Sequence, residues 1–130
     1  MAKIKHIAIR TTDVEKTVAF YKELFDLKQV GRGLNGIYLS DGHINLAILK
    51  YQPEKNQEPT KIGVDHLGFL VEDVDGTLAK VSALGGKALT DRIYLTPTDS
   101  STPQSYFEVR CMGPDDQVFD VSGSGWVGTD

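Results

Sequence analysis

The sequence predicts an α+β fold made of two consecutive copies of one β-α-β-β-β unit. The first observation is an internal repeat: residues 6–21 recur as residues 66–81, without a gap. The second is hydrophobic periodicity, which alternates in the expected strands and follows a helical stripe after Asp13 and Asp73. The third is a length of 130 residues, enough for one domain with a core. The identities within the repeat are His6/His66, Asp13/Asp73, Val14/Val74, Thr17/Thr77 and Ala19/Ala79.

Residues 3–10 form the first expected strand. Ile7 and Ile9 share one face, so His6, Ala8 and Arg10 fall on the other. We interpret the apolar face as the one that a helix covers. His6 therefore points away from the expected helix.

A helix is predicted to follow, with Asp13 as its N-cap. Apolar residues then recur at i, i+4, i+7 and i+11, which is the spacing of one helical stripe. We expect this stripe to pack on the apolar face of the first strand. Its members are Val14, Val18, Tyr21 and Phe25.

Three strands complete the first unit, at residues 28–32, 36–40 and 44–51. Glycine, asparagine and aspartate at residues 33–36 and 41–42 supply the turn chemistry between them. Residues 52–62 are polar with two prolines, which is typical of a linker.

The second unit repeats this plan after the linker. A strand is expected at residues 64–71, and a helix begins at Asp73 and ends near Gly85-Gly86. Three further strands follow, and the polar loop at residues 96–105 has the composition of a lid or a disordered segment. The expected strands are 87–94, 106–112 and 117–122. The predicted organisation is one domain, 1–130: module one at about 1–51, the linker at 52–62, module two at about 63–122, and a tail at 123–130 anchored by Trp126.

Composition excludes several classes of partner. The net charge is −4, the pI is about 5.3 and no basic run is present, so we expect small molecules and not nucleic acid as ligands. No apolar run has the length of a signal peptide or a membrane span. The single cysteine, Cys111, forms no internal disulfide, and we expect it on the helix side of its strand. A cytoplasmic protein that does not enter a membrane is the expectation.

Face parity brings four polar residues to the side of the sheet that no helix covers. If the apolar residues of each strand face the helices, His6, Asn45, His66 and Asp120 fall opposite, one from each of four pseudo-equivalent strands. If the turns that precede the last strand of each module are aligned without a gap, Leu46 pairs with Asp120 instead. We favour parity, because it buries no polar residue under a helix.

Two imidazoles and one carboxylate form the donor set of a facial triad, which suits a divalent transition metal with positions left open for water and substrate. His6, His66 and Asp120 are therefore the predicted metal ligands. Iron, manganese, nickel and zinc are all compatible with this set. Asn45 is a neutral neighbour, either a weak ligand or a donor to a bound substrate.

Other polar residues are expected near this face. Tyr106 and Glu108 are candidate general acids or bases, while Arg110 and Arg10 are candidates for holding an anionic group. His43 and Tyr38 are candidate substrate contacts at the rim.

At these residues the sequence resembles the vicinal-oxygen-chelate superfamily, which includes glyoxalase I, extradiol dioxygenases, fosfomycin-resistance thiol transferases, methylmalonyl-CoA epimerases and bleomycin-binding proteins. The resemblance covers nearly the whole chain. It is carried by His6-Ile-Ala-Ile9, the run Ala19-Phe-Tyr-Lys-Glu-Leu-Phe-Asp-Leu27, Asp65-His-Leu-Gly-Phe69 and the closing Gly113-Pro-Asp-Asp-Gln-Val-Phe-Asp120. The last run is similar to the family signature Asp-Pro-Asp-Gly-Asn-x-x-Glu.

The resemblance implies a cupped mixed sheet around a metal, with helices on its outer face and ligands at His6, Asn45, His66 and Asp120. Two departures are visible: glyoxalase I and the epimerases have glutamate where this chain has Asn45 and Asp120. Ala8 also replaces the hydroxyl residue of the thiol transferases.

The hypothesis from sequence is a metal-dependent enzyme that stabilises an enolate or oxyanion in lyase or isomerase chemistry. Extradiol-type dioxygenase, thiol transferase and a metal-free binding protein of the bleomycin-resistance type are the alternatives. We also expect a homodimer, since half-cup sheet edges need partners and the family pairs its modules within a chain or across a dimer.

Overall fold

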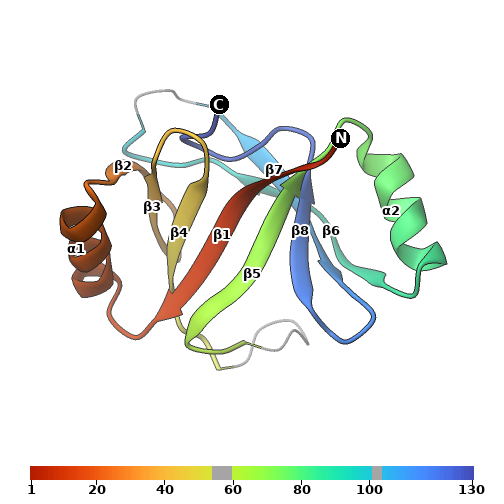
Figure 1. The fold of residues 1–130 in the computed structure, drawn as a ribbon, viewed down its shortest axis with the longest axis horizontal. Helices are drawn as coiled ribbons and strands as arrows, with labels where there is room; N and C mark the ends of the chain where they lie inside the picture. The colour runs from red at the N-terminus through yellow and green to blue at the C-terminus, as the bar shows by residue number, and fades with distance from the viewer. Residues whose placement is uncertain (54–59, 101–103) are drawn as a thin grey trace.

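The protein folds around one eight-stranded sheet with two helices, shown by a computed structural model that describes residues 1–53, 60–100 and 104–130 (Figure 1). The element order is β1 (Lys3–Thr11), α1 (Val14–Phe25), β2 (Lys28–Arg32), β3 (Gly36–Ser40), β4 (Asn45–Lys50), β5 (Gly63–Leu70), α2 (Val74–Ala83), β6 (Lys87–Leu95), β7 (Tyr106–Met112) and β8 (Val118–Ser122). The predicted tandem β-α-β-β-β fold is confirmed. Part of the expected linker (54–59) and of the expected loop (101–103) lies outside the described residues.

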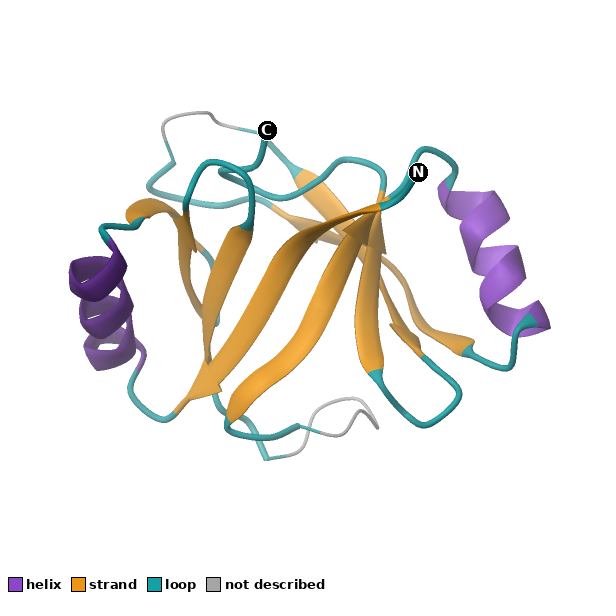
Figure 2. Cartoon of the chain, viewed as in Figure 1, coloured by secondary structure: helices purple, strands orange, loops and turns teal. Residues whose placement is uncertain are grey.

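The two modules join within one chain. The strand order is β2-β3-β4-β1-β5-β8-β7-β6, and β1 pairs antiparallel with β5 at the centre. Within the modules, β1 pairs parallel with β4, and β5 pairs parallel with β8. The sheet curls into a cup between the two helices (Figure 2). The inner edges of the two modules are thus paired with each other within the chain.

Helix α1 covers the outer face of the first module. Asp13 is its N-cap, with a side chain that accepts from the Lys16 amide at 3.1 Å, as expected. Val18 packs in a buried cluster with Ile37, Leu39 and Ile48. The predicted stripe is wrong at its end, because Phe25, the last residue of the helix, is 60% exposed.

Helix α2 repeats the arrangement on the second module. Asp73 caps it by accepting from the Gly76 amide at 3.0 Å, and Gly85 follows its end at φ 93°. Val74 packs with Val109, Cys111 and Val121 in a buried cluster, so Cys111 lies on the helix side as predicted. Neither helix is long and apolar enough to cross a membrane, and they are the only helices in the part of the chain described.

The tail folds back into the cup. Trp126 and Val127 are buried, and Val127 packs with Ala8, Tyr38 and Ala47 on the inner face. The Ser40 hydroxyl donates to the Gly128 carbonyl at 2.7 Å, which fixes the tail to β3. The concave face is therefore partly filled by the C-terminal segment, and the rest of it forms the cavity described below.

Candidate metal centre

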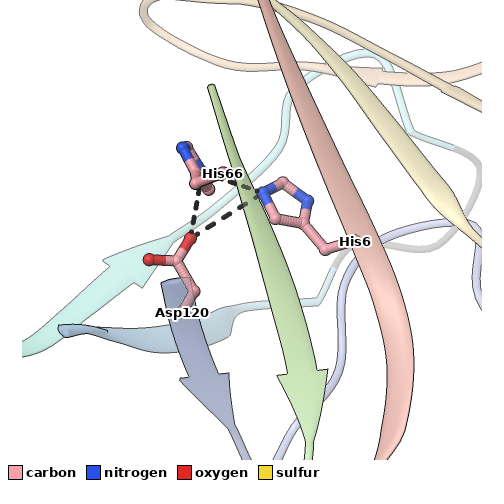
Figure 3. A group of neighbouring side chains, drawn as sticks. All are labelled: His6, His66 and Asp120. Carbon is pink, nitrogen blue, oxygen red and sulfur yellow. Dashed lines mark hydrogen bonds and ion pairs between the residues drawn. The ribbon is translucent and has the colours of Figure 1, made fainter. Parts of the chain in front are cut away.

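His6, His66 and Asp120 converge on the inner face (Figure 3). They come from β1, β5 and β8, and all three are buried. The Nε2 atoms of the two histidines are 3.3 Å apart. Oδ2 of Asp120 lies 3.1 Å from Nε2 of His66 and 3.8 Å from Nε2 of His6.

This arrangement fits a divalent ion. An ion about 2.1 Å from each of its ligands places neighbouring ligand atoms roughly 3.0 to 3.4 Å apart, close to the spacing seen here. The donor set of two imidazoles and one carboxylate suits a transition metal. Histidine ligands also require a free lone pair on the coordinating nitrogen, which depends on the other ring nitrogen.

Each histidine has its own acceptor for Nδ1–H. Oδ1 of Asn45 lies 2.7 Å from Nδ1 of His6, and Oδ2 of Asp65 lies 2.6 Å from Nδ1 of His66. When both Nδ1 atoms donate, both Nε2 atoms are left to face Asp120. The two acceptors thus select the tautomer that a metal ligand needs.

Asn45 is not the counterpart of Asp120, which corrects the equivalence drawn from sequence. Asp120 pairs with Gly68, and the repeat places Gly68 on Ala8, which pairs with Ala47. Asn45 lies on the predicted face but two residues earlier, where its Nδ2 donates to the Val127 carbonyl at 3.0 Å. Parity fixed the face, but it could not fix the register along the strand. Because Ala47 occupies the strand position equivalent to Asp120, the candidate centre has three side chains that could be ligands and not four.

Arg110 holds Asp120 from the other side. Its Nε donates to Oδ1 of Asp120 at 2.6 Å, and its Nη2 donates to Oδ2 at 3.2 Å. Arg110 also donates to Glu108 at 2.8 Å. The second Glu108 oxygen accepts from the Trp126 indole at 3.0 Å. The Trp126 ring stacks on His6, with centroids 4.9 Å apart.

Burial and charge shift the pKa values of this cluster in opposite directions. Burial lowers the pKa of His6 to about 4. Burial also lowers the pKa of His66, but the charge and hydrogen bond of Asp120, with the bond to Asp65, outweigh it and raise the value to about 9. Burial would raise the pKa of Asp120, yet the charges of His66 and Arg110 hold it far below its usual range.

Glu108 behaves differently from Asp120. Burial, followed by the nearby Asp120 charge, raises its pKa to about 7 against the opposing effect of Arg110. A carboxyl group with this pKa exchanges a proton near neutral pH, which is the property of a general acid or base.

A cavity of about 280 Å³ opens from the centre. His6, His66, Glu108, Arg110, Arg10 and Tyr38 line it, with an apolar mouth that includes Leu34 and Tyr94. Burial raises the pKa of Tyr38. Both arginines are already paired with carboxylates: Arg10 with Asp65 at 3.5 Å, and Arg110 with Asp120 and Glu108.

Three predicted site residues lie away from this cavity. Asn45 is behind His6, buried and bonded through both amide atoms. His43 is an exposed residue whose Nδ1 lies 2.9 Å from the Asp130 carboxylate. Tyr106 packs against the cluster that contains Val127, and both residues line a separate pocket.

Two residues near the centre, Asp65 and Trp126, were not predicted from the sequence as part of it. Asp65 should face the helices by strict alternation, but a β-bulge lies between the pairs Ala8–His66 and Ile9–Val64 and turns it inward. Trp126 was expected only to anchor the tail. An acidic residue directly before the histidine was the one signal that could have found Asp65.

Comparisons with known proteins agree with the fold. The family model of the Glyoxalase/Bleomycin resistance protein/Dioxygenase superfamily matches residues 3–104. The chain belongs to this superfamily. The match covers both histidine ligands and most of the two modules.

Relatives of this superfamily member include the uncharacterized protein YaeR of Escherichia coli (strain K12). It is 29% identical over 106 residues, covering 72% of this chain and 79% of that protein. The Mn(II)-bound glyoxalase from Novosphingobium aromaticivorans has a TM-score of 0.71 at 20% identity, over 98% of this chain and 40% of that one. Methylmalonyl-CoA epimerase of Streptomyces coelicolor has a TM-score of 0.65 at 20% identity, over 92% and 94%. At these identities the structures show a shared fold.

Proposed function

We propose that this protein is a divalent-metal-dependent enzyme that acts on a small molecule by glyoxalase-like lyase or isomerase chemistry. His6, His66 and Asp120 would hold the ion, and Glu108 would move the proton. The observation that carries the proposal is the convergence of the three ligand atoms within 4.8 Å on the wall of a cavity that also holds Glu108. When bound, a divalent ion polarises substrate oxygens.

The residues of the cavity have separate tasks in this proposal. Glu108, with a pKa near 7, accepts a proton from the substrate and returns it. Trp126 and Arg110 each donate to one Glu108 oxygen and fix the carboxyl group. Ala47 leaves room for the substrate opposite Asp120, and the apolar mouth excludes water. Arg10, Arg110 and Tyr38 are proposed substrate contacts.

Asn45, His43 and Tyr106 do not line the cavity, so we propose no direct contact between them and the substrate. Asn45 would orient His6 and would not touch the substrate, because its amide is fully engaged behind the ring. His43 and Tyr106 lie off the main cavity. The proposal therefore places proton transfer on Glu108 alone.

Metal analysis tests the proposal directly. Protein purified without oxygen should contain about one divalent ion per chain, and His66→Ala should lose it while the circular dichroism spectrum is retained. His43→Ala is the matched control, since His43 is exposed and outside the cavity. Absence of any ion, with no uptake on titration, would contradict the proposal.

The identity of the ion separates the branches of chemistry. Iron(II) would favour extradiol-type ring cleavage, for which the three-ligand set of two histidines and one carboxylate is suited. Nickel, zinc or manganese would favour lyase, isomerase or thiol-transfer chemistry.

A metal-free binding protein is the second candidate. Arg110 and His66 already satisfy Asp120 in the absence of an ion, through contacts of 2.6 and 3.1 Å. The cavity would then hold a ligand without chemistry, as bleomycin-binding members of the superfamily are expected to do. The same metal titration distinguishes it from the enzyme.

We also propose a homodimer in the cytoplasm. Phe20, Leu24 and Phe25 on α1 are each more than half exposed, and Phe20 and Leu24 lie one turn apart on the same face of the helix. Sedimentation equilibrium at micromolar concentration should give twice the chain mass, and Leu24→Glu should lower it. A monomeric mass for the wild type would refute the dimer.

A further inference from the structure

Asp65 is brought to the metal centre by an irregularity of the central strand pair. Two β-bulges interrupt the pairing of β1 with β5, one at Lys5 and one at Asp65. The repeat places these residues on each other, since each directly precedes a histidine ligand. Each bulge turns its extra side chain inward, and both side chains are buried to at least nine-tenths.

The two bulge residues have different contacts. The Lys5 ammonium reaches the Asp130 carboxylate in the tail. Asp65 instead contacts the ring of its own neighbour, with Oδ2 2.6 Å from Nδ1 of His66. Because Asn45 is the acceptor for His6, one ligand has a neutral partner and the other has a charged one.

Arg10 lies next to the Asp65 carboxylate as an ion-pair partner, without a hydrogen bond from its Nε. Its Nε lies 3.5 Å from Oδ2 of Asp65, and its Nη1 donates to the Lys50 carbonyl at 3.1 Å. Both side chains are 2% exposed, so water does not compete for the carboxylate. Such a buried, countered carboxylate is a strong and directional acceptor.

We propose that Asp65 is a positioning residue of the metal centre. It fixes the His66 ring so that Nε2 faces the ion, and its negative charge strengthens that nitrogen as a donor. The positive charge of Arg10 offsets the charge of Asp65 in the interior. This inference rests on the proposed metal-dependent function and assigns a role to residues outside the ligand set.

The first test is the affinity for Mn²⁺ or Ni²⁺. Binding is monitored by the fluorescence of Trp126, the single tryptophan, which stacks on His6. Asp65→Ala should weaken binding by roughly 10- to 100-fold. Asp65→Asn, which keeps the shape and an acceptor oxygen, should lie between it and the wild type. Asp91→Asn, an exposed aspartate of β6, is the matched control and should bind normally.

A spectroscopic readout separates positioning from general stability. Protein loaded with Co²⁺ should show two exchangeable, hyperfine-shifted imidazole N–H resonances, one from each ligand. Asp65→Ala should lose the His66 signal through faster exchange and keep that of His6. Asn45→Ala should do the reverse, which also assigns the two signals.

Asp65→Asn leaves the buried charge of Arg10 without its partner, which could itself weaken binding. The double variant Arg10→Met/Asp65→Asn removes both buried charges. If both variants lose the same affinity, the loss does not come from an unpaired arginine. Unchanged affinity in the Asp65 variants, or a retained His66 resonance in Asp65→Ala, overturns the inference while the metal centre stands. A wild type that binds no ion overturns both.

Discussion

His66 lies between two carboxylates. Without an ion, Nδ1 is 2.6 Å from Asp65 and Nε2 is 3.1 Å from Asp120. This explains why its pKa rises to about 9 although burial acts in the opposite direction. Burial lowers the pKa of His6 to about 4, because the Asp120 charge and the hydrogen bond to Asn45 raise it by less. Two residues that match in the repeat thus differ in charge at neutral pH.

The stability of the metal-free protein should depend on pH through His66. A folded-state pKa above the unfolded value of 6.5 adds stability that is fully present below pH 6.5 and is lost as pH rises through about 9. The free energy of unfolding, measured with urea after chelation, should fall across this window.

His66→Gln is the control for that slope, because the variant lacks the titrating ring. Glu108 adds a separate loss between pH 4.5 and about 7, since its raised pKa favours the protonated folded state. The decline between pH 7 and about 9 should therefore vanish in His66→Gln, whereas the raised pKa of Cys111 produces a further decline above pH 9 in both proteins. An unchanged decline would show that another group is responsible.

Glu108 should be the residue whose loss affects chemistry more than metal binding. Glu108→Gln keeps an acceptor for Trp126 but cannot take up a proton. Once a substrate is known, kcat should fall by roughly 10²- to 10⁴-fold. Mn²⁺ affinity, measured in parallel, should change little, and a large loss of affinity would assign Glu108 to the ligand set.

At the scale of elements, helices and strands were predictable because their signals are local. Asp13 and Asp73 mark helix starts by type and position, and both cap as expected. Strand alternation placed His6 and Asp120 on the inner face for the same reason. The repeat supplied the tandem order of the elements.

The remaining features of the site depend on contacts between strands. The bulge that turns Asp65 inward is an extra residue relative to β1, which no pattern within β5 reveals. The register that sets Ala47, and not Asn45, opposite Asp120 is likewise a property of a strand pair. The position of Trp126 results from long-range packing against Gly68, where an added Cβ would lie 2.7 Å from the indole.

The cap of α2 should cancel the usual stabilising effect of a helical Gly→Ala substitution. A Cβ on Gly76 would lie 2.2 Å from Oδ2 of Asp73, so alanine displaces the capping carboxylate. Loss of the cap, about 1 kcal/mol, then offsets the gain in helix propensity of about the same size. We expect little net change in unfolding free energy for Gly76→Ala.

A double-mutant cycle isolates this effect. In the Asp73→Ala background no cap remains to be displaced, so Gly76→Ala should stabilise the protein by up to about 1 kcal/mol. Equal effects of Gly76→Ala in both backgrounds would show that the cap tolerates the methyl group.

At the scale of the molecule, the tail completes the cup that the two modules form. Trp126 covers His6 and donates to Glu108, and Val127 accepts from Asn45. The ligands from the two modules are therefore braced by a segment that belongs to neither repeat. The tail lies on the same face as the candidate metal centre, and Trp126 lines the cavity.

Removing residues 126–130 should both destabilise the fold and loosen the centre. The truncation removes a tryptophan that is 2% exposed and leaves the buried Asn45 amide and one Glu108 oxygen without their tail partners. Loss of a buried tryptophan alone costs about 3 to 5 kcal/mol, and the stranded polar groups add to it. Chemical denaturation should show a loss of at least this size, with weaker Mn²⁺ binding by calorimetry. Trp126→Phe, which keeps one stacked ring and loses the bond to Glu108 and part of the packing against Gly68, should retain more of the stability and the Mn²⁺ affinity than the truncation. If the truncated chain matches the wild type in both measurements, the tail does not support the site.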